Sequence, residues 1–345
     1  MIETTLMKSV LDALNNALHQ AMSADSRVFL LGEDVLDPYG GAFKVTRGMS
    51  SAFPERVLTT PISEAGITGM AAGMALRGLR PVVEIMFGDF VTLIADQLIN
   101  HIAKFRWMYN DQVSLPLVVR TPMGGRRGYG PTHSQTLEKL FLGTPGLTVL
   151  APNSLGDPGR LLTYSVLQSQ APILFIENKL LYLLTVQDPA LLADFELNTL
   201  PVSSIPGGPE TITLALRGAP PPVLTLTAYG YMAELCRQAA WRLAYEHELF
   251  VELVVPDQLS PYTIDPLLTS LQKTGRLLAI EEGSLTMGWG AELLARCAEV
   301  LGPQLHLARR LGAQDLPVPA SPSLEEAVLP GVDDILHLAC SMLNN

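Results

Sequence analysis

The chain has 345 residues and a mass of 37.3 kDa, which is long for one ordinary hydrophobic core and fits two domains. Hydrophobic residues make up 48% of the chain and charged residues 17%, so global disorder is excluded. Acidic residues outnumber basic ones by 34 to 23, for a formal net charge of −11, which argues against a nucleic-acid-binding protein.

The first half of the chain alternates helix-like and strand-like segments. Residues 9–22 place apolar side chains on one helical face, and residues 28–31 predict a short, fully apolar strand. A further helix is expected over residues 90–109. Further apolar strands are expected at residues 81–87, 117–119, 147–150 and 173–176. Continuous apolar strands separated by helices predict a parallel sheet that is covered on both faces.

Proline and glycine interrupt this pattern between residues 183 and 222. The stretch contains seven prolines and the pair Gly207-Gly208, and it shows few charges and no clear period. We interpret residues 186–222 as a proline-rich linker that runs over the surface of the first domain.

Alternation resumes after the proline-rich stretch. The expected strands are residues 223–227, 249–255 and 276–280, and the expected helices are residues 232–245, 264–273, 291–300 and 323–343. The sequence therefore predicts two α/β domains, residues 1–185 and 223–345, each with a mostly parallel sheet flanked by helices.

Signals for targeting, membranes and metals are sparse. The segment Met1–Thr4 lacks a basic region followed by an apolar run, so we expect no secretory signal. No stretch reaches about 18 apolar residues without a charge or a proline, which argues against a membrane span. Three widely spaced cysteines without a Cys-x-x-Cys pair predict no zinc site. We expect a soluble, cytoplasmic protein with no metal ligands of its own.

The densest cluster of unusual features is residues 59–67. Ser63 occupies an N-cap position, and Glu64 opens a helix that is rich in alanine and glycine. Because each glycine weakens a helix by about 1 kcal/mol relative to alanine, close approach of another backbone or subunit is the natural reason for them. Taken alone, Glu64 is equally explained as an acid favoured by the helix dipole.

A second cluster is the glycine-rich segment 120–135, which follows a predicted strand. Loops at the carboxyl ends of parallel strands are where α/β proteins place ligands. His133 is either a loop proton donor or a structural histidine. The adjacent Ser134 is not a suitable nucleophile, because no Gly-x-Ser-x-Gly elbow is present. Arg126-Arg127 is either a solvated pair or a contact to an anionic ligand.

These stretches together resemble the β subunit of the thiamine-diphosphate-dependent E1 component of 2-oxo acid dehydrogenase complexes, in the transketolase-like superfamily. The resemblance covers nearly the whole chain, and its motifs occur in family order. The motifs of the first domain are Gly32-Glu33-Asp34-Val35, residues 40–46, residues 60–66, residues 78–84, Asp89-Phe90, residues 96–100, residues 130–135, Pro145-Gly146-Leu147 and residues 177–182. Those of the second domain are Ala228-Tyr229-Gly230, residues 273–276 and residues 315–319.

The resemblance implies a pyrimidine-binding domain followed by a C-terminal transketolase domain, with roles for four residues. Glu64 matches the family glutamate that hydrogen-bonds N1′ of the cofactor's aminopyrimidine, and Phe90 matches the aromatic residue that packs on the pyrimidine ring. His133 matches the histidine that assists acyl transfer to lipoyl. Glu33 is expected as a supporting acid near the cofactor. Glu64 and His133 are thus the candidate catalytic residues, and Glu33, Glu64 and Phe90 the candidate cofactor-binding ones.

The resemblance also implies a partner. Thiamine diphosphate carries a charged tail that needs Mg²⁺ held by oxygen ligands, and in this family a Gly-Asp-Gly segment of the α subunit holds both. No Gly-Asp-Gly occurs in this chain, and Gly88-Asp89-Phe90 is its nearest equivalent. We therefore expect an α₂β₂ heterotetramer in which this chain supplies half of each cofactor site.

Two departures from the family pattern bear on function. Arg126-Arg127 stands where the family loop is rich in glycine, which leaves the acyl acceptor open between lipoyl and a phosphopantetheine-bearing carrier. The segment 168–172 lacks the aspartate of the family's structural potassium site, so that site is in doubt.

The leading hypothesis is an E1 β subunit that decarboxylates a 2-oxo acid with its α partner and passes the acyl group to lipoyl-E2. One alternative keeps the cofactor and changes the acceptor, to a carrier-protein thiol in a biosynthetic pathway or to an aldose as in a split transketolase. The other alternative is a non-catalytic scaffold subunit. The choice of 2-oxo acid stays open between pyruvate and branched acids.

Overall fold

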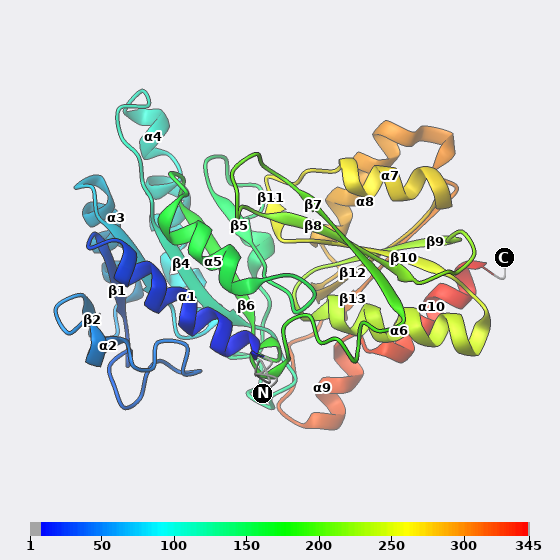
Figure 1. Cartoon of the computed structure of the whole chain (residues 1–345), viewed down its shortest axis with the longest axis horizontal. Coiled ribbons are helices and arrows are strands. Elements are labelled where there is room, and N and C mark those ends of the chain that lie inside the picture. The colour runs from blue at the N-terminus through cyan, green and yellow to red at the C-terminus, as the bar shows by residue number, and fades with distance from the viewer. Residues whose placement is uncertain (1–7, 344–345) are drawn as a thin grey trace, which may run out of the picture.

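A computed structural model describes residues 8–343 of the chain, so the expectation for Met1–Thr4 lies outside the described residues. The chain folds around two sheets that lie side by side, with helices on their faces (Figure 1). This arrangement confirms the predicted fold class of two mostly parallel sheets flanked by helices. No helix between residues 8 and 343 is both long and apolar enough to cross a membrane.

The first sheet has seven strands, and all neighbours are parallel except one edge pair. In spatial order the strands are β11 (Gln258–Ser260), β5 (Thr148–Leu150), β6 (Ile173–Asn178), β4 (Val118–Met123), β3 (Arg80–Glu84), β1 (Val28–Gly32) and β2 (Val57–Thr59). Because the central strands are parallel, their carboxyl ends meet at one edge of the sheet, which is where such folds place ligands.

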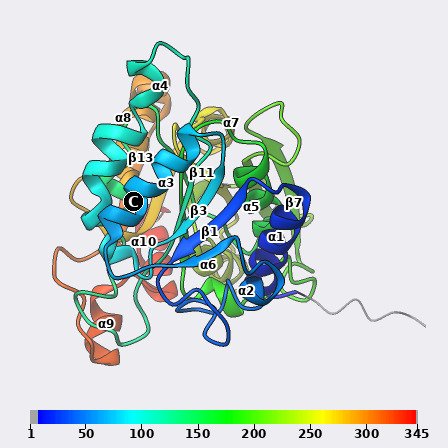
Figure 2. The same ribbon diagram turned by 90° about the vertical axis from the view of Figure 1, so that its left-hand side faces the viewer.

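Helices cover both faces of the first sheet, as its continuous apolar strands predict. Helices α1 (Val10–Ala24) and α5 (Pro158–Leu167) lie on one face and pack against each other. Helix α3 (Glu64–Leu76) lies on the opposite face with the helical turns η1 (Gly88–Ile94) and η2 (Gln97–Ile102). Figure 2 shows α1 and α3 on opposite sides of β1 and β3.

The second sheet has six strands and is flanked by α6 (Tyr231–His247), α7 (Asp265–Thr274), α8 (Trp289–Leu301) and α10 (Val332–Leu343). Its strands in spatial order are β13 (Leu307–Ala313), β12 (Arg276–Ser284), β9 (Leu224–Ala228), β10 (Val251–Pro256), β8 (Glu210–Leu216) and β7 (Phe195–Pro201). The four strands from β13 to β10 are parallel, and β8 and β7 are antiparallel additions at one edge.

The stretch interpreted as a linker, residues 186–222, departs from that interpretation because it contains β7 and β8. Its prolines fall at strand ends and turns, such as Pro201 and Pro209, where they cost no ladder hydrogen bond in the sheet interior. Ile212 and Leu214 of β8 alternate into the core of the second sheet. The high proline content thus marks an edge hairpin, and the hairpin belongs to the second sheet.

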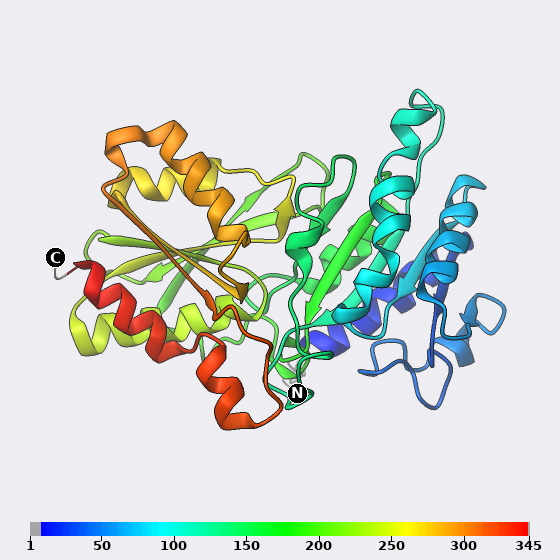
Figure 3. The ribbon, with the colours of Figure 1, turned by 180° about the vertical axis from the view of Figure 1, so that it is seen from behind.

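Two predicted helices are interrupted. The segment 90–109 forms the 3₁₀ turn η1, the π-helical η2 and the short helix α4 (Phe105–Met108), although Ile94, Leu98 and Ile102 face inward as one apolar row. The segment 323–343 divides into α9 (Pro322–Val328) and α10, visible as the two red helices of Figure 3. Pro330 lies between these last two helices, where it prevents their continuation.

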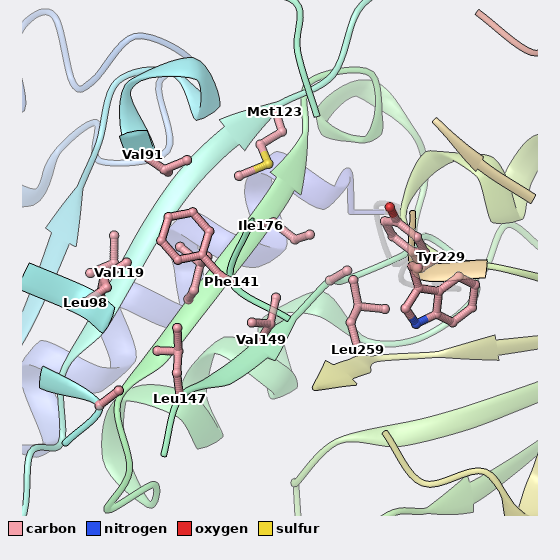
Figure 4. Packing of buried hydrophobic residues seen from close by; sticks show 14 of the residues in the cluster. Val91, Leu98, Val119, Met123, Phe141, Leu147, Val149, Ile176, Tyr229 and Leu259 are labelled. Atoms are coloured by element: carbon pink, nitrogen blue, oxygen red, sulfur yellow. The ribbon is translucent and has the colours of Figure 1, made fainter. Parts of the chain in front are cut away.

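The two sheets share one hydrophobic cluster. The cluster extends from Phe141, Ile176 and Leu259 of the first sheet region to Tyr229 beside the second (Figure 4). Trp289 of α8 belongs to the same cluster. Strand β11 lies in the second half of the chain but pairs with β5 of the first sheet, so the halves also exchange backbone hydrogen bonds. Because the core is continuous, the relative position of the two halves is fixed by packing.

Buried carboxyl groups lie at the junction of the two sheets. The Glu138 carboxyl accepts a hydrogen bond from the Tyr229 hydroxyl, and burial raises the pKa of Glu138. Glu281 accepts backbone N–H bonds from Trp289 and Gly290, 2.8 and 3.0 Å long, at the start of α8. Burial, and then the charge of Glu138, raise the pKa of Glu281 to about 7.

We expect the edge hairpin to contribute to the core as a true part of the second domain. Ile212→Ala should lower the free energy of unfolding by about 2–5 kcal/mol, because a fully buried side chain leaves a cavity. Ile205→Ala, in the half-exposed turn of the same hairpin, should change it by less than about 0.5 kcal/mol. Urea unfolding measures both, and equal small effects would mean that the stretch is a loosely attached linker.

We also expect Glu281 to make stability depend on pH. Its pKa in the folded chain lies near 7, above its ordinary value of 4.5, so the folded chain keeps a proton that the unfolded chain has lost. Stability from this group is full below about pH 4.5 and declines as the pH rises to about 7. Glu281→Gln should flatten that decline in unfolding free energy, and the exposed control Glu299→Gln should leave it unchanged. An unaltered slope in Glu281→Gln would contradict the assignment.

Candidate active site at the carboxyl edge of the first sheet

Two carboxyl groups lie beyond the ends of β1 and β2, near enough for the charge of one to act on the other. Strand pairing continues past these strands, since the Thr60 N–H donates to the Gly32 carbonyl at 3.1 Å. The turn places half-buried Glu33 beside Glu64, the buried first residue of α3. Burial, and then the charge of Glu64, raise the pKa of Glu33. The structure thus brings together two of the four predicted site residues.

Polar atoms around this carboxyl pair lack partners within the described chain. Glu33 Oε1 and Thr60 Oγ1 are both buried, and no described residue hydrogen-bonds either atom. Buried polar atoms are normally paired, so two unpaired ones at the turn that carries Glu33 indicate a place for a hydrogen-bonding ligand. An aminopyrimidine ring, which carries both donors and acceptors, has the chemistry that such atoms require.

Ser63 does occupy the predicted N-cap position of α3, but its side chain makes no capping hydrogen bond. Its hydroxyl oxygen lies against Gly66, where an added Cβ would approach it to 2.9 Å. A Cβ at position 66 would need only the exposed Ser63 hydroxyl to move, so this contact does not by itself require glycine. An added Cβ at Gly69 or Gly73 would meet nothing within 4 Å, so the described chain gives no packing reason for these two glycines.

Aromatic rings line the site beyond β3. The Phe90 ring lies 5.4 Å from the His133 ring, and the Phe87 ring lies 4.8 Å from it, both edge to face. Phe87 also contacts Phe43 and Tyr129 at centroid distances of 5.6 and 5.9 Å. Because β3 is the parallel neighbour of β1, with Glu84 beside Gly32, these rings share an edge with Glu33. All four predicted site residues therefore lie at one edge of the sheet.

The segment 124–135 forms a closed loop that carries His133. Its ends meet where the Gly124 N–H donates to the Gln135 carbonyl. Asp89 holds this end of the loop, since its Oδ1 atom accepts from Gln135 Nε2 at 2.8 Å. On the other side, Lys179 Nζ donates to the His133 carbonyl oxygen. The imidazole Nδ1 lies 3.0 Å from Thr132 Oγ1.

Carboxylates of the second domain hold the start of the same loop. Glu282 of β12 accepts the Gly125 N–H at 2.6 Å, and Glu325 of α9 accepts the Arg126 N–H at 2.7 Å. Glu325 also accepts the Gly128 N–H at 3.2 Å. Arg126 adopts a positive φ of 65°, and its guanidinium donates to the Pro330 carbonyl, whereas Arg127 is exposed. The predicted arginine pair is therefore divided between a structural and a surface role.

A buried ion-pair cluster lies beneath the site. Arg120 of β4 is 1% exposed and donates to Glu84 of β3 at 2.9 Å and to Glu177 of β6 at 2.8 and 2.7 Å. The Tyr182 hydroxyl donates to Glu177 at 2.7 Å. A buried charge is tolerated only when it is paired and hydrogen-bonded, and here one guanidinium pairs with two carboxyl groups. The cluster ties together the carboxyl ends of three strands.

The segment expected for a potassium site is occupied by internal hydrogen bonds. The guanidinium of buried Arg80 donates to the carbonyl oxygens of Val166 and Ser169, at 2.5 and 2.6 Å. Ser169 Oγ donates in turn to the Ala171 carbonyl. A side-chain cation thus satisfies carbonyl oxygens in the segment where the resemblance would have implied a potassium site.

Both halves of the chain match known protein families. Residues 7–183 match the model of the transketolase pyrimidine binding domain, and residues 217–335 match that of the transketolase C-terminal domain. The pyruvate dehydrogenase E1 component subunit beta-2 of rice mitochondria is 37% identical over 96% of this chain and 85% of its own length. The chain belongs to the β-subunit family of 2-oxo acid dehydrogenase E1 components.

Other relatives show the breadth of this family. The acetoin:2,6-dichlorophenolindophenol oxidoreductase subunit beta of Bacillus subtilis is 34% identical, with 97% of both chains covered. The 3-methyl-2-oxobutanoate dehydrogenase subunit beta of Mycobacterium tuberculosis is 33% identical over 97% of this chain and 91% of its own. A split-gene transketolase, solved as an inactive beta4 tetramer, shares the fold with a TM-score of 0.73 at 20% identity, covering 97% and 98% of the two chains.

Sequence reasoning missed several residues that shape the site. Lys179 lies inside the family motif of residues 177–182, and Phe87 ends the expected strand 81–87, but their contacts to the His133 segment depend on the fold. Glu282 and Glu325 lie in the second domain, and no local pattern marks them as partners of the 124–135 loop. Arg120 follows two apolar residues of a fully buried strand, and this unusual position for a charge is the one available signal.

We expect Arg120 to be essential to the folded edge of the sheet. Arg120→Met should lower the free energy of unfolding by about 3–5 kcal/mol, because it leaves two buried carboxyl groups without their cation. Arg106→Met is a matched control, since it removes an exposed pair with Asp111 and should cost less than about 1 kcal/mol. Thermal or urea unfolding tests the pair, and similar losses in both variants would contradict this account.

Proposed function

We propose that this chain is the β subunit of a 2-oxo acid dehydrogenase E1 component, an oxidoreductase. In this proposal it acts with an α subunit, thiamine diphosphate and Mg²⁺ to decarboxylate a 2-oxo acid, and the acyl group passes to lipoyl-E2. Membership of the E1 β family supports the proposal. The observation that carries it is the proximity of Glu33 and Glu64, together with two buried polar atoms, Glu33 Oε1 and Thr60 Oγ1, that have no hydrogen-bond partner among residues 8–343.

The residues at this edge fit the aminopyrimidine half of the cofactor. Thiamine diphosphate, when bound, supplies the nucleophilic carbon and the electron sink that decarboxylation requires. We assign Glu64 to share a proton with N1′ of the aminopyrimidine, which is general acid–base work for a carboxyl group. Glu33 lies beside Glu64 as a second acid, and Phe90 offers an aromatic ring for packing.

We assign the diphosphate, Mg²⁺ and the remaining half of the site to an α subunit with a Gly-Asp-Gly segment. Asp89, in the nearest equivalent segment, accepts both the Gln135 N–H and its side-chain amide through Oδ1, which gives this acid a structural use within the chain. The unfilled side of α3 at Gly69 and Gly73, together with half-exposed Met70, supports close approach of another subunit in an α₂β₂ assembly.

His133 is assigned to acyl transfer. Its imidazole lies beside Phe87 and Phe90 at the edge that carries Glu33, which supports a role for His133 in the transfer step. Exposed Arg127 is the one member of the arginine pair at the surface, which weakens the argument for a double-arginine contact to a phosphopantetheine carrier. A lipoyl acceptor is therefore the preferred one.

The substrate class follows the names of the relatives. Pyruvate, 3-methyl-2-oxobutanoate and acetoin appear among them, and the first two are 2-oxo acids. The plant relatives are named as mitochondrial proteins, so the cytoplasmic location of this chain stays a prediction.

Glu64→Ala should abolish decarboxylation while leaving assembly intact. In the complex reconstituted with its α partner, thiamine diphosphate and Mg²⁺, release of labelled CO₂ from pyruvate or 3-methyl-2-oxobutanoate should fall by about 10²–10⁴-fold, the usual worth of a positioned acid–base group. The exposed Glu55→Ala provides the control and should retain the wild-type rate.

Native mass spectrometry of the same samples separates loss of chemistry from loss of assembly. A heterotetramer holding two cofactors is expected for the wild type and for both variants. Full decarboxylation by Glu64→Ala would overturn the assignment of this residue. A homo-oligomer without cofactor, from wild-type protein purified with its host partners, would favour a scaffold subunit instead.

A further inference from the structure

Lys179 is a buried lysine at the centre of the site that the proposed function leaves without a role. It follows β6, and its own N–H donates to the Met123 carbonyl at 3.0 Å, which fixes its backbone to the end of β4. The residue is 1% exposed, and among the described residues no carboxylate forms an ion pair with it. A buried lysine without an ion pair is costly, so its position calls for a reason.

The ammonium group faces one carbonyl oxygen and two aromatic rings. Nζ donates to the carbonyl oxygen of His133 and lies 5.3 Å from the ring centroids of both Phe87 and Tyr129. Phe87 is also the closer ring partner of His133, at 4.8 Å. Lys179 therefore contacts the His133 segment in two ways. It donates a hydrogen bond to the His133 carbonyl oxygen, and its ammonium group lies over the Phe87 ring, which also contacts the imidazole.

Charges around Lys179 leave it cationic over most of the physiological range. Burial lowers its pKa to about 8, while the charges of Asp89, Glu282 and Glu325 oppose that shift. The same three carboxylates hold the 124–135 loop. Asp89 accepts from Gln135, Glu282 from Gly125 and Glu325 from Arg126. The lysine and the loop's anchors thus form one electrostatic unit around the loop.

We infer that Lys179 is a positioning residue for His133, fixing the imidazole against Phe87 and Phe90 by holding the His133 carbonyl oxygen. The loop carrying His133 is anchored at residues 125–128 and at Gln135, and Lys179 adds a side-chain hydrogen bond to the main chain of His133. A hydrogen bond from a charged donor is worth more than a neutral one, which suits a residue that must fix a loop. Only the catalytic consequence of this inference rests on the proposed function.

Lys179→Met removes the charge and the donor while keeping the length and apolar stem of the side chain. Hydrogen exchange, followed by mass spectrometry on the full chain, should show amides of residues 130–135 exchanging at least about tenfold faster, the effect of losing one such hydrogen bond. Lys139→Met is the matched control, because Lys139 donates to Ser284 and Thr286 away from the His133 segment. The control should leave this peptide unchanged.

The catalytic readout compares two half-reactions of the reconstituted complex. Decarboxylation is followed with 2,6-dichlorophenolindophenol as electron acceptor, and acyl transfer with a lipoyl domain. Lys179→Met should lower acyl transfer by about 10- to 100-fold relative to decarboxylation, because a displaced catalytic group costs that much. A purely structural role would lower both half-reactions together and leave their ratio unchanged.

Each outcome decides between these accounts. Faster exchange with a lowered transfer-to-decarboxylation ratio supports the inference, whereas unchanged exchange or an unchanged ratio overturns it. A wild-type complex inactive in both assays would overturn the proposed function, and the exchange comparison would then decide alone whether Lys179 holds His133. If Lys179→Met does not fold, Lys179→Gln carries the same expectations, because its shorter side chain does not span to the carbonyl oxygen.

Discussion

The pairing of Arg120 with two buried carboxyl groups is the constraint on which the site depends. It links the carboxyl ends of β3, β4 and β6, and the elements of the site begin directly beyond those ends. Phe87 and Phe90 follow β3, the His133 loop follows β4, and Lys179 follows β6. Because a guanidinium forms bidentate bonds in a fixed plane, the three strands cannot shift independently. The relative positions of the site's elements are therefore fixed by the buried ion pairs of Arg120 with Glu84 and Glu177.

The second domain completes the first rather than adding a separate function beside it. Its contributions to the site are backbone hydrogen bonds accepted by Glu282 and Glu325, which determine where the 124–135 loop begins. The continuous hydrophobic cluster between the sheets keeps these two carboxylates at a fixed distance from the loop. The candidate site lies on the first domain, but the position of its 124–135 loop thus depends on the packing between the two domains.

The sequence supported prediction wherever local pattern and chemistry agreed. Apolar runs located the central parallel strands. The family motifs singled out Glu33, Glu64, Phe90 and His133, and the fold places these four residues at one edge of the first sheet, although their roles remain proposals. The edge hairpin of residues 195–216 was missed because its strand signal is broken by prolines that fall at its ends and turn. Lys179 was missed for a different reason. Its partner is the main-chain carbonyl oxygen of His133, and because every residue has such an oxygen, the sequence does not indicate which one a lysine will bind.

The hydrogen bonds from the 124–135 loop to Glu282 and Glu325 limit how the two halves of this chain can be exchanged with those of relatives. The loop belongs by sequence to the pyrimidine-binding half, yet its first turn is secured by acids encoded more than 150 positions later. A chimera that joined this first half to the C-terminal half of a relative would keep the motifs of the first half. It would still lose these hydrogen bonds, unless the relative had acidic residues at the positions of Glu282 and Glu325. The two halves therefore form a matched pair at this loop, so that replacing one of them requires acids at the equivalent places in the other.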